Sequence, residues 1–379
     1  MGEEVRMRIL VTGARGFVGK NLCVALRRLP NLELFEYDVD SRLQYLDEAL
    51  AVADIIFHLA GVNRPQNAEE YRAGNAGFTA EICKKLQRLG RAPKIVMSSS
   101  IQAKLNNPYG ISKRFAEGIL RRFAVDTGAE CVAYRLKNLF GKWCRPNYNS
   151  VTATFCYNAS HGLPLQISDR NNVVDLTYID DAVQAFVMEI ERPSRPGFRF
   201  ASPLASHAVT LGELADTIKG FADHRGTLQL PNYEETFIRA LYATYLSYLD
   251  TDDFAYNLDI KSDDRGGLAE LIKAPCFGQI FVSRTKPGIT RGNHYHHTKT
   301  EKFMVLQGEG VIRFRRIDGN EVIEYLVKGE EYRVVDIPPG YTHSIENVGD
   351  KEMVTLFWSS EVFDPDSPDT YWDTVIPSK

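Results

Sequence analysis

The chain has 379 residues, of which 44% are hydrophobic and 25% charged, the composition of a folded globular protein rather than a fibre or a disordered chain. Its 45 lysines and arginines and 49 aspartates and glutamates give a net charge of −4, which argues against a strongly basic nucleic-acid binder. No apolar run approaches the roughly 18 residues that a membrane span needs.

Length, cysteines and the first residues set further expectations. At roughly 150 residues per domain, the length predicts two or three domains. The six cysteines are far apart and form no C-x-x-C pair, a pattern typical of reduced thiols in a cytoplasmic protein. The acidic first residues lack the apolar segment of a secretory leader. One interpretation of residues 1–6 is an extension that precedes a natural start at Met7.

The first half of the chain alternates short β-branched runs with helical patterns. Strands are predicted at residues 8–11, 32–38, 54–61 and 94–100. Such alternation predicts a doubly wound, Rossmann-like α/β domain with a parallel sheet and right-handed crossovers. Helical periodicity continues at residues 211–223 and 234–249, and the helical stretch 232–249 is the expected connector to the next domain.

From about residue 252 the pattern changes to short Val, Ile, Phe and Tyr segments between Gly, Pro and Asp turns. Strands are predicted at residues 278–283, 302–306, 310–316, 322–327, 332–337 and 353–358. Many short strands with close turns indicate an all-β barrel or sandwich. The expected domains are therefore residues 1–250 and 251–379.

A glycine-rich segment follows the first predicted strand and opens the first helix. In that position glycines let the backbone turn tightly and approach a pyrophosphate, which lies on the free N–H groups of the helix. We predict that a dinucleotide binds here, and the segment contains Gly13, Arg15, Gly16, Phe17, Val18 and Gly19.

The residues after the second strand leave the choice of dinucleotide open. Asp38 closes that strand, where a carboxylate would bind the free ribose 2′-OH of NADH. Arg15 and Arg42 lie nearby in sequence, and either would instead meet the 2′-phosphate of NADPH. We favour NADPH and keep NADH as the alternative.

Tyr109 and Lys113 are four residues apart and so share one face of a predicted helix. We expect Lys113 to lower the pKa of Tyr109 and to hold the nicotinamide ribose. Tyr109 would then protonate the alkoxide that develops when a hydride reaches a carbonyl carbon. Ser100 ends a predicted strand and would hydrogen-bond the same oxygen. These three residues are the predicted catalytic set.

The first 230 or so residues resemble an extended short-chain dehydrogenase/reductase of the nucleotide-sugar type. The matching segments are 12–19, 58–61, 98–100, 109–113 and 135–141, together with Asn75. The resemblance implies that Leu59 and Ala60 lie along the cofactor and that Asn138 faces the diphosphate of a sugar nucleotide.

Three further residues of this region have competing interpretations. His58 stands at a strand end, where a buried core histidine is favoured over a catalytic role. The resemblance implies that Asn75 supports the Lys113 site, and a helix-surface amide is the alternative. For Arg135 the interpretation is a structural role as the partner in an ion pair.

The second half contains a set of residues with the spacing of metal ligands. His294 and His296 are two apart on a predicted strand and so point to one face. Glu301 is expected to begin the next strand, and His343 to enter from another strand after a Pro-Gly turn. Three imidazoles and a carboxylate suit Zn²⁺, Fe²⁺, Mn²⁺ or Ni²⁺, with zinc preferred.

This spacing resembles the motif pair of the cupins, which implies a jelly-roll barrel. The second motif departs from the family pattern, because Tyr332 stands where a glycine is expected six residues before Pro338. The alternative to a metal site is a cupin barrel whose polar residues hydrogen-bond to one another without metal.

Segments 264–270 and 291–294 resemble deoxysugar epimerases with the cupin fold. The resemblance implies that Arg265 and Arg291 face a nucleotide diphosphate and that His294 removes a proton beside a 4-keto group. A metal ligand cannot also be a free base. Either a metal polarises the ketone while another group is the base, or the metal is structural. The alternative for Arg265 and Arg291 is that they are ordinary surface residues.

The two halves together resemble the bifunctional epimerase/reductases of capsule and O-antigen synthesis that act on UDP-2-acetamido-2,6-dideoxy-hexos-4-ulose. The resemblance implies C3 epimerisation in the cupin, C4 reduction with NADPH in the first half, and a homodimer. No nucleic-acid or membrane partner is expected. The alternatives are a single-activity reductase with a structural metal-binding cupin and a non-catalytic NADP-sensing module.

Overall fold

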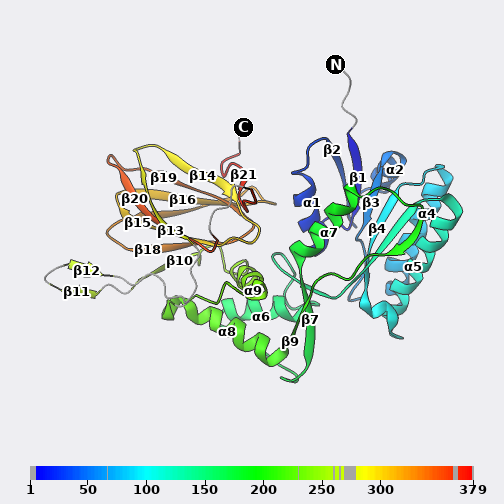
Figure 1. The fold of residues 1–379 in the computed structure, drawn as a ribbon, viewed down its shortest axis with the longest axis horizontal. Helices are drawn as coiled ribbons and strands as arrows, with labels where there is room; N and C mark the ends of the chain where they lie inside the picture. The colour runs from blue at the N-terminus through cyan, green and yellow to red at the C-terminus, as the bar shows by residue number, and fades with distance from the viewer. Residues whose placement is uncertain are drawn as a thin grey trace, which may run out of the picture. The chain divides into compact units, whose positions relative to one another are not determined.

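The computed structural model describes residues 6–65, 67–228, 230–258, 261–263, 266–268, 279–361 and 366–377. The chain folds as two compact units (Figure 1). The first contains residues 1–139, 148–150 and 174–208, and the second contains residues 140–147, 151–173 and 209–379. The division into domains at residue 250 rests on the change of sequence pattern and stays a prediction.

The first unit is built on a six-stranded sheet whose neighbouring strands are all parallel. In spatial order the strands are β2 (Leu32–Tyr37), β1 (Met7–Thr12), β3 (Ile55–His58), β4 (Lys94–Ser100), β5 (Glu130–Leu136) and β8 (Gly197–Phe200). The strand order reverses between β1 and β3, and in such sheets ligands bind outside the carboxyl ends of the strands at this point.

Helices cover both faces of this sheet (Figure 1). They are α1 (Phe17–Leu26), α2 (Leu43–Val52), α3 (Ala68–Tyr71), α4 (Phe78–Arg88), α5 (Pro108–Thr127) and α7 (Ile179–Glu191). Apolar residues of α2, α4 and α5 form a core cluster with the sheet, while α1 packs against α7. A π-helical turn, η1 (Arg72–Gly77), precedes α4, and a 3-10 turn, η2 (Ile101–Lys104), follows β4.

The second unit contains two five-stranded antiparallel sheets. One has the order β10 (Ala255–Asn257), β18 (Arg333–Ile337), β15 (Glu301–Gln307), β20 (Met353–Ser359), β13 (Gln279–Thr285). The other has the order β17 (Val322–Lys328), β16 (Glu309–Arg316), β19 (Tyr341–Asn347), β14 (Thr290–Tyr295), β21 (Tyr371–Trp372). This is the all-β second half that the sequence predicts.

Three helices belong to the second unit together with these sheets. They are α6 (Val151–Ser160), α8 (Leu211–Thr227) and α9 (Thr236–Leu246). Helix α8 begins at Leu211 because Thr210 and Glu213 form a capping box, each satisfying a backbone N–H of the other. The remaining strands are β6 (Asn138–Phe140), β7 (Val173–Tyr178) and β9 (His207–Thr210), which form one sheet, and the hairpin β11 (Lys261–Asp263) and β12 (Gly266–Leu268).

Two further expectations concern the described part of the chain. Among the residues described, no helix combines the length and the apolar character needed to cross a membrane. The described cysteines form no disulfide, as predicted, and all of them are buried; these are Cys23, Cys83, Cys131, Cys144 and Cys156. Cys276 lies outside the described residues.

Candidate active site and metal centre

The glycine-rich segment forms a tight backbone cradle at the end of β1. Gly13 has a φ of +71°, and a Cβ there would lie 2.7 Å from the backbone nitrogen of Ala60. A Cβ at Gly19 would lie 2.0 Å from the carbonyl oxygen of Gly13. Gly16 is the N-cap of α1, and no side chain caps that helix. The N–H groups of its first turn are therefore available to a pyrophosphate, so the site fits a dinucleotide.

The carboxylate of Asp38 binds the backbone of this cradle, and Asp38 follows the last residue of β2 rather than closing the strand. It accepts a hydrogen bond of 2.7 Å from the backbone N–H of Arg15. The guanidinium of Arg15 forms an exposed ion pair with Asp40. An exposed pair of this kind contributes little free energy, so Arg15 is available to exchange Asp40 for another anion.

Lys113 and Tyr109 lie one turn apart on α5, close to the end of β4. The ammonium of Lys113 is buried, donates a hydrogen bond of 3.1 Å to the carbonyl of Ser98, and lies 5.9 Å from the centroid of the Tyr109 ring. The ring of Tyr71 packs on the same tyrosine, with the centroids 5.6 Å apart. The structure therefore brings the predicted phenol and ammonium together.

The expected effect of Lys113 on Tyr109 is not seen. Burial raises the pKa of Tyr109, and hydrogen bonding to Ser100 opposes that rise only in part. Burial also lowers the pKa of Lys113 from 10.5 to about 8, against the opposing charge of Glu117. Desolvation disfavours the charged form of both groups, and it is the largest cause of both pKa shifts.

A partly buried ion pair involves Glu117, which is one turn further along α5 than Lys113. Glu117 on α5 accepts hydrogen bonds from Arg135 at 2.9 and 2.6 Å and from the hydroxyl of Ser99 at 2.6 Å. The interpretation of Arg135 as a structural ion-pair partner is confirmed, because both carboxylate oxygens of Glu117 are engaged by its guanidinium.

Asn75 is buried on the π-helical turn η1, so the alternative of a surface amide is wrong. Its amide donates to the hydroxyl of Ser112 at 2.9 Å and its oxygen accepts from the N–H of Val62 at 3.0 Å. A Cβ built on Gly61 would lie 2.7 Å from the Asn75 oxygen and 2.9 Å from the Lys113 nitrogen. Asn75 and Lys113 therefore flank the same backbone segment.

His58 is a core histidine, as the sequence favours. Its ring lies between the hydroxyls of Thr12 and Thr79, at 2.8 and 2.9 Å. Burial, with a smaller contribution from Lys113, lowers the pKa of His58 to about 3, so the ring is neutral near pH 7. Leu59 and Ala60 follow it at the end of β3, beside Gly13.

Asn138 begins β6 and is exposed. Its amide donates a hydrogen bond of 3.3 Å to the backbone carbonyl of Asp175. Arg291 lies on β14, where its guanidinium donates to the hydroxyl of Thr285 and the carbonyl of Arg284, each at 3.0 Å. Arg265 lies outside the described residues.

The four predicted metal ligands converge in the second unit, and their ligand atoms all lie within 4.8 Å of one another. His294 is on β14, Glu301 is the first residue of β15, and His343 is on β19. His296 follows the last residue of β14 rather than lying on it, which corrects the prediction of two histidines on one strand.

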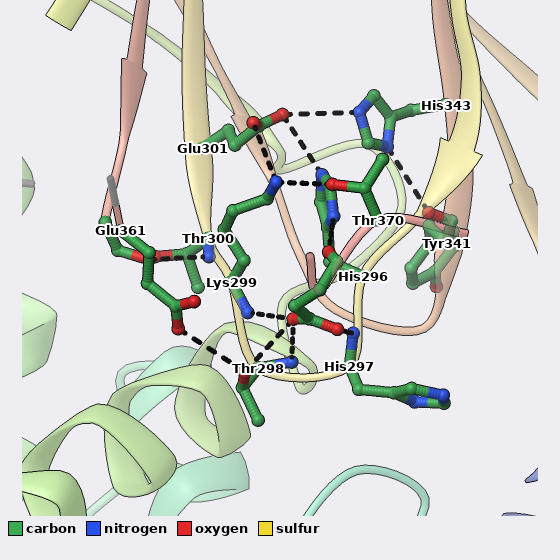
Figure 2. A network of polar contacts seen from close by, with 12 residues as sticks. His296, His297, Thr298, Lys299, Thr300, Glu301, Tyr341, His343, Glu361 and Thr370 are labelled. Carbon is green, nitrogen blue, oxygen red and sulfur yellow. Dashed lines mark hydrogen bonds and ion pairs between the residues drawn. The ribbon is translucent and has the colours of Figure 1, made fainter. Parts of the chain in front are cut away.

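The geometry of these groups fits a metal ion. The Nε2 atoms of His296 and His343 lie 3.2 and 3.4 Å from one oxygen of Glu301 (Figure 2). Both nitrogens are buried and neither has a hydrogen-bond partner among the described residues. Metal–ligand bonds of about 2.0 Å in tetrahedral geometry place ligand atoms roughly 3.3 Å apart, so the spacing suits an ion between them.

Burial and neighbouring charges set the protonation of this centre. Burial, reinforced by His343 and His296, lowers the pKa of His294 to about 3. Burial would raise the pKa of Glu301, but the imidazoles of His296 and His343 hold it well below its usual value. Neutral imidazole and ionised carboxylate are the forms that bind a metal.

Asp369 lies beside the metal ligands and was not predicted from the sequence. Its carboxylate accepts hydrogen bonds from the backbone N–H groups of His297, Thr298 and Lys299, at 2.9, 2.7 and 2.6 Å. Nothing in the spacing of the histidines points to a residue this far along the chain. A capping carboxylate of this kind is recognisable only once the loop it binds has been placed.

Two families of known proteins match separate parts of the chain. The NAD dependent epimerase/dehydratase family matches residues 9–198, and the polysaccharide biosynthesis C-terminal domain matches residues 261–371. The chain is 42% identical to UDP-2-acetamido-2,6-beta-L-arabino-hexul-4-ose reductase of Pseudomonas aeruginosa, over 96% of this chain and 98% of that protein.

Solved structures extend the comparison. The capsular polysaccharide assembling protein CapF from Staphylococcus aureus is 47% identical, with a TM-score of 0.66 over 97% of this chain and 100% of that one. UDP-glucuronic acid 4-epimerase from Bacillus cereus is 18% identical over 57% of this chain and 84% of that one, and its TM-score of 0.51 shows a shared fold.

The predicted fold, a Rossmann-like dehydrogenase/reductase domain followed by a cupin barrel, is confirmed. The chain belongs to the NAD dependent epimerase/dehydratase family and is a relative of the Pseudomonas reductase, which it matches over nearly its whole length.

Proposed function

We propose that this protein is an NADPH-dependent reductase of a UDP-linked 2-acetamido-2,6-dideoxy-4-keto-hexose, and that its barrel epimerises C3 of the same sugar before reduction. The observation that carries the proposal is 42% identity to a UDP-sugar reductase over 96% of the chain. The proximity of Tyr109, Lys113 and Ser100 supports it, because these groups suit proton delivery to a ketone oxygen.

In the proposed reduction, bound NADPH supplies a hydride to C4 of the sugar. As the new C–H bond forms, the electron pair of the carbonyl moves to its oxygen, and Tyr109 donates its phenolic proton there. Ser100 hydrogen-bonds the same oxygen and holds it in line with the phenol. Lys113 stabilises the phenolate left behind and binds the nicotinamide ribose, until solvent returns the proton to Tyr109.

The proposed cofactor site combines the glycine cradle with residues of neighbouring strands. Gly13, Gly16 and Gly19 would admit the pyrophosphate, with Phe17 and Val18 in the first turn of α1. Arg15 would leave Asp40 for the 2′-phosphate of NADPH, and this exchange is our reason for preferring NADPH to NADH.

The proposed epimerisation uses the acidity of a C–H bond beside a ketone. A base removes the C3 proton and a proton returns to the other face. Zn²⁺ or another divalent cation, held by His294, His296, Glu301 and His343, would supply Lewis-acid polarisation of the ketone. Arg291 and Arg265 are the proposed contacts to the diphosphate, and the base stays unassigned.

The proposal predicts two separable steps, which isotopic exchange distinguishes. The protein is incubated with the 4-keto UDP-sugar in deuterated water without cofactor, and NADPH is added afterwards. We expect deuterium at C3 before reduction and consumption of NADPH after it. Reduction without exchange would leave a single-activity reductase with a structural barrel, and absence of both would leave a non-catalytic cofactor-binding module.

We further propose that the protein is a homodimer that pairs sheet edges of two barrels, since an uncovered edge strand is prone to pair with another strand. Light scattering of the purified protein would give twice the chain mass. A mass equal to that of one chain over the working concentration range would contradict the dimer.

A further inference from the structure

The last described segment of the chain is residues 366–377, and we call it the C-terminal strap. It contacts the loop from His296 to Glu301, which carries two of the predicted metal ligands. It pairs with β14 through β21, so that Trp372 is opposite His294 and Tyr371 is opposite Tyr295. The strap is far from the ligands in sequence, yet it makes polar contacts next to each of them.

Asp369 fixes the loop that joins two of the ligands. The loop runs from His296 to Glu301, and Asp369 accepts its backbone N–H groups and also the hydroxyl of Thr298, at 3.0 Å. A single carboxylate therefore holds the turn between a histidine ligand and the carboxylate ligand.

The strap also fixes the orientation of one ligand ring. The backbone carbonyl of Asp369 hydrogen-bonds Nδ1 of His296. Because a carbonyl only accepts, Nδ1 is the donor in this bond, and the ring is turned so that Nε2 lies 3.2 Å from an oxygen of Glu301. The hydroxyl of Thr370 accepts from Lys299 at 2.6 Å, and Lys299 lies 4.0 Å from the other oxygen of Glu301 (Figure 2).

A second residue of the strap, Asp373, contacts the neighbours of the other two histidines. Asp373 accepts from Arg315 at 2.7 Å and from the hydroxyl of Thr342, the residue before His343. Its backbone N–H donates at 2.9 Å to the carbonyl of Asn293, the residue before His294. Asn293 has a φ of +58° at a bulge between β14 and β19, so its strained backbone is held from the strap.

From these contacts we propose that the C-terminal strap holds the metal ligands in binding geometry, with Asp369 and Asp373 as positioning residues. The inference rests on the metal site of the proposed function. Converging three imidazoles and a carboxylate in a buried centre is unfavourable without an ion, so the surrounding contacts must supply the arrangement. Groups that orient metal ligands in this way typically change metal affinity by about 10- to 100-fold when removed.

The test measures metal binding by the full chain rather than turnover. The protein is stripped of metal and titrated with Zn²⁺ in competition with a chromophoric chelator, and its Co²⁺ form is examined by visible absorption. Asp369→Asn retains the shape of the side chain but presents an NH₂ group to the loop N–H groups. We expect Zn²⁺ binding to weaken about 10- to 100-fold, with a changed Co²⁺ spectrum.

Asp373→Asn is the second variant and is expected to act in the same direction, so that the test does not depend on one variant folding. Asp350→Asn, on an exposed turn, is the matched control and should bind as the original protein does. A variant that loses thermal stability without metal but keeps its Zn²⁺ affinity and Co²⁺ spectrum would show a purely structural role and overturn the proposal. Failure of the unaltered protein to bind Zn²⁺ would overturn the metal site itself, and the strap's role with it, while NADPH oxidation would still test the reductase.

Discussion

The ammonium of Lys113 lies 5.9 Å from the ring centroid of Tyr109 and donates a hydrogen bond to the carbonyl of Ser98. The strand that ends in serines and the helix that carries the tyrosine are thus joined by a buried cation. Without bound cofactor this arrangement lowers the stability of the folded protein, because burial disfavours the charged ammonium and lowers the pKa of Lys113 to about 8.

Lys113→Met is expected to stabilise the protein while abolishing reduction. Below pH 8 Lys113 is protonated in both folded and unfolded chains, and the folded protein bears the whole cost of burying the charge. From pH 8 to 10.5 the folded protein binds fewer protons than the unfolded one, so stability rises with pH and the cost disappears. We expect a gain of about 1 to 3 kcal/mol at pH 7 in denaturant unfolding. This account would be contradicted if Lys113→Met were less stable than the unaltered protein at pH 7. It would also be contradicted if the variant were still more stable by the same amount at pH 10.5.

Gly19→Ala is expected to disrupt the cofactor cradle. A Cβ there would lie 2.0 Å from the backbone oxygen of Gly13, so the loop has to move and cofactor affinity should fall by at least about tenfold. Gly118→Ala on α5 is the matched control, since its Cβ meets nothing within 4 Å. The control should be stabilised by about 0.5 to 1 kcal/mol and bind cofactor normally. Equal cofactor binding by both variants would argue against the cradle.

Metal removal is expected to lower the thermal stability of the protein. A ligand that binds only the folded state stabilises it by about 2.7 kcal/mol at 100 times its dissociation constant. Calorimetry with and without a chelator should therefore show a lower melting temperature after removal, restored by Zn²⁺. Glu301→Gln lacks the charged ligand of the site, so its melting temperature should change little on adding either the chelator or Zn²⁺. A chelator response as large in Glu301→Gln as in the unaltered protein would place the bound metal elsewhere.

Local patterns predict the elements that carry the site, because hydrophobic runs and turn residues are local signals. The predicted strand 94–100 coincides with β4, and Glu301 begins β15 as its spacing suggests. The start of α5 follows equally local chemistry, with Asn107 as N-cap and Pro108 at the first helical position.

Contacts between distant segments account for what the sequence does not predict. Asn75 is buried because η1 inserts a wider turn before α4, and π-helical turns have no periodic sequence signal. Asp369 reaches a loop about 70 positions earlier in the chain. The pKa of Tyr109 depends on burial rather than on its spacing from Lys113, and burial is known only after packing.

The measurement that tests the central claim most directly is single-turnover NADPH oxidation by Tyr109→Phe with the 4-keto UDP-sugar. This variant lacks only the proposed proton donor, and loss of general acid catalysis slows a reaction by about 10²- to 10⁴-fold. We predict that the rate falls within that range while NADPH binding, measured by its fluorescence, is unchanged. An unaltered rate, or a loss explained wholly by weaker NADPH binding, would contradict the assignment of Tyr109 as the acid.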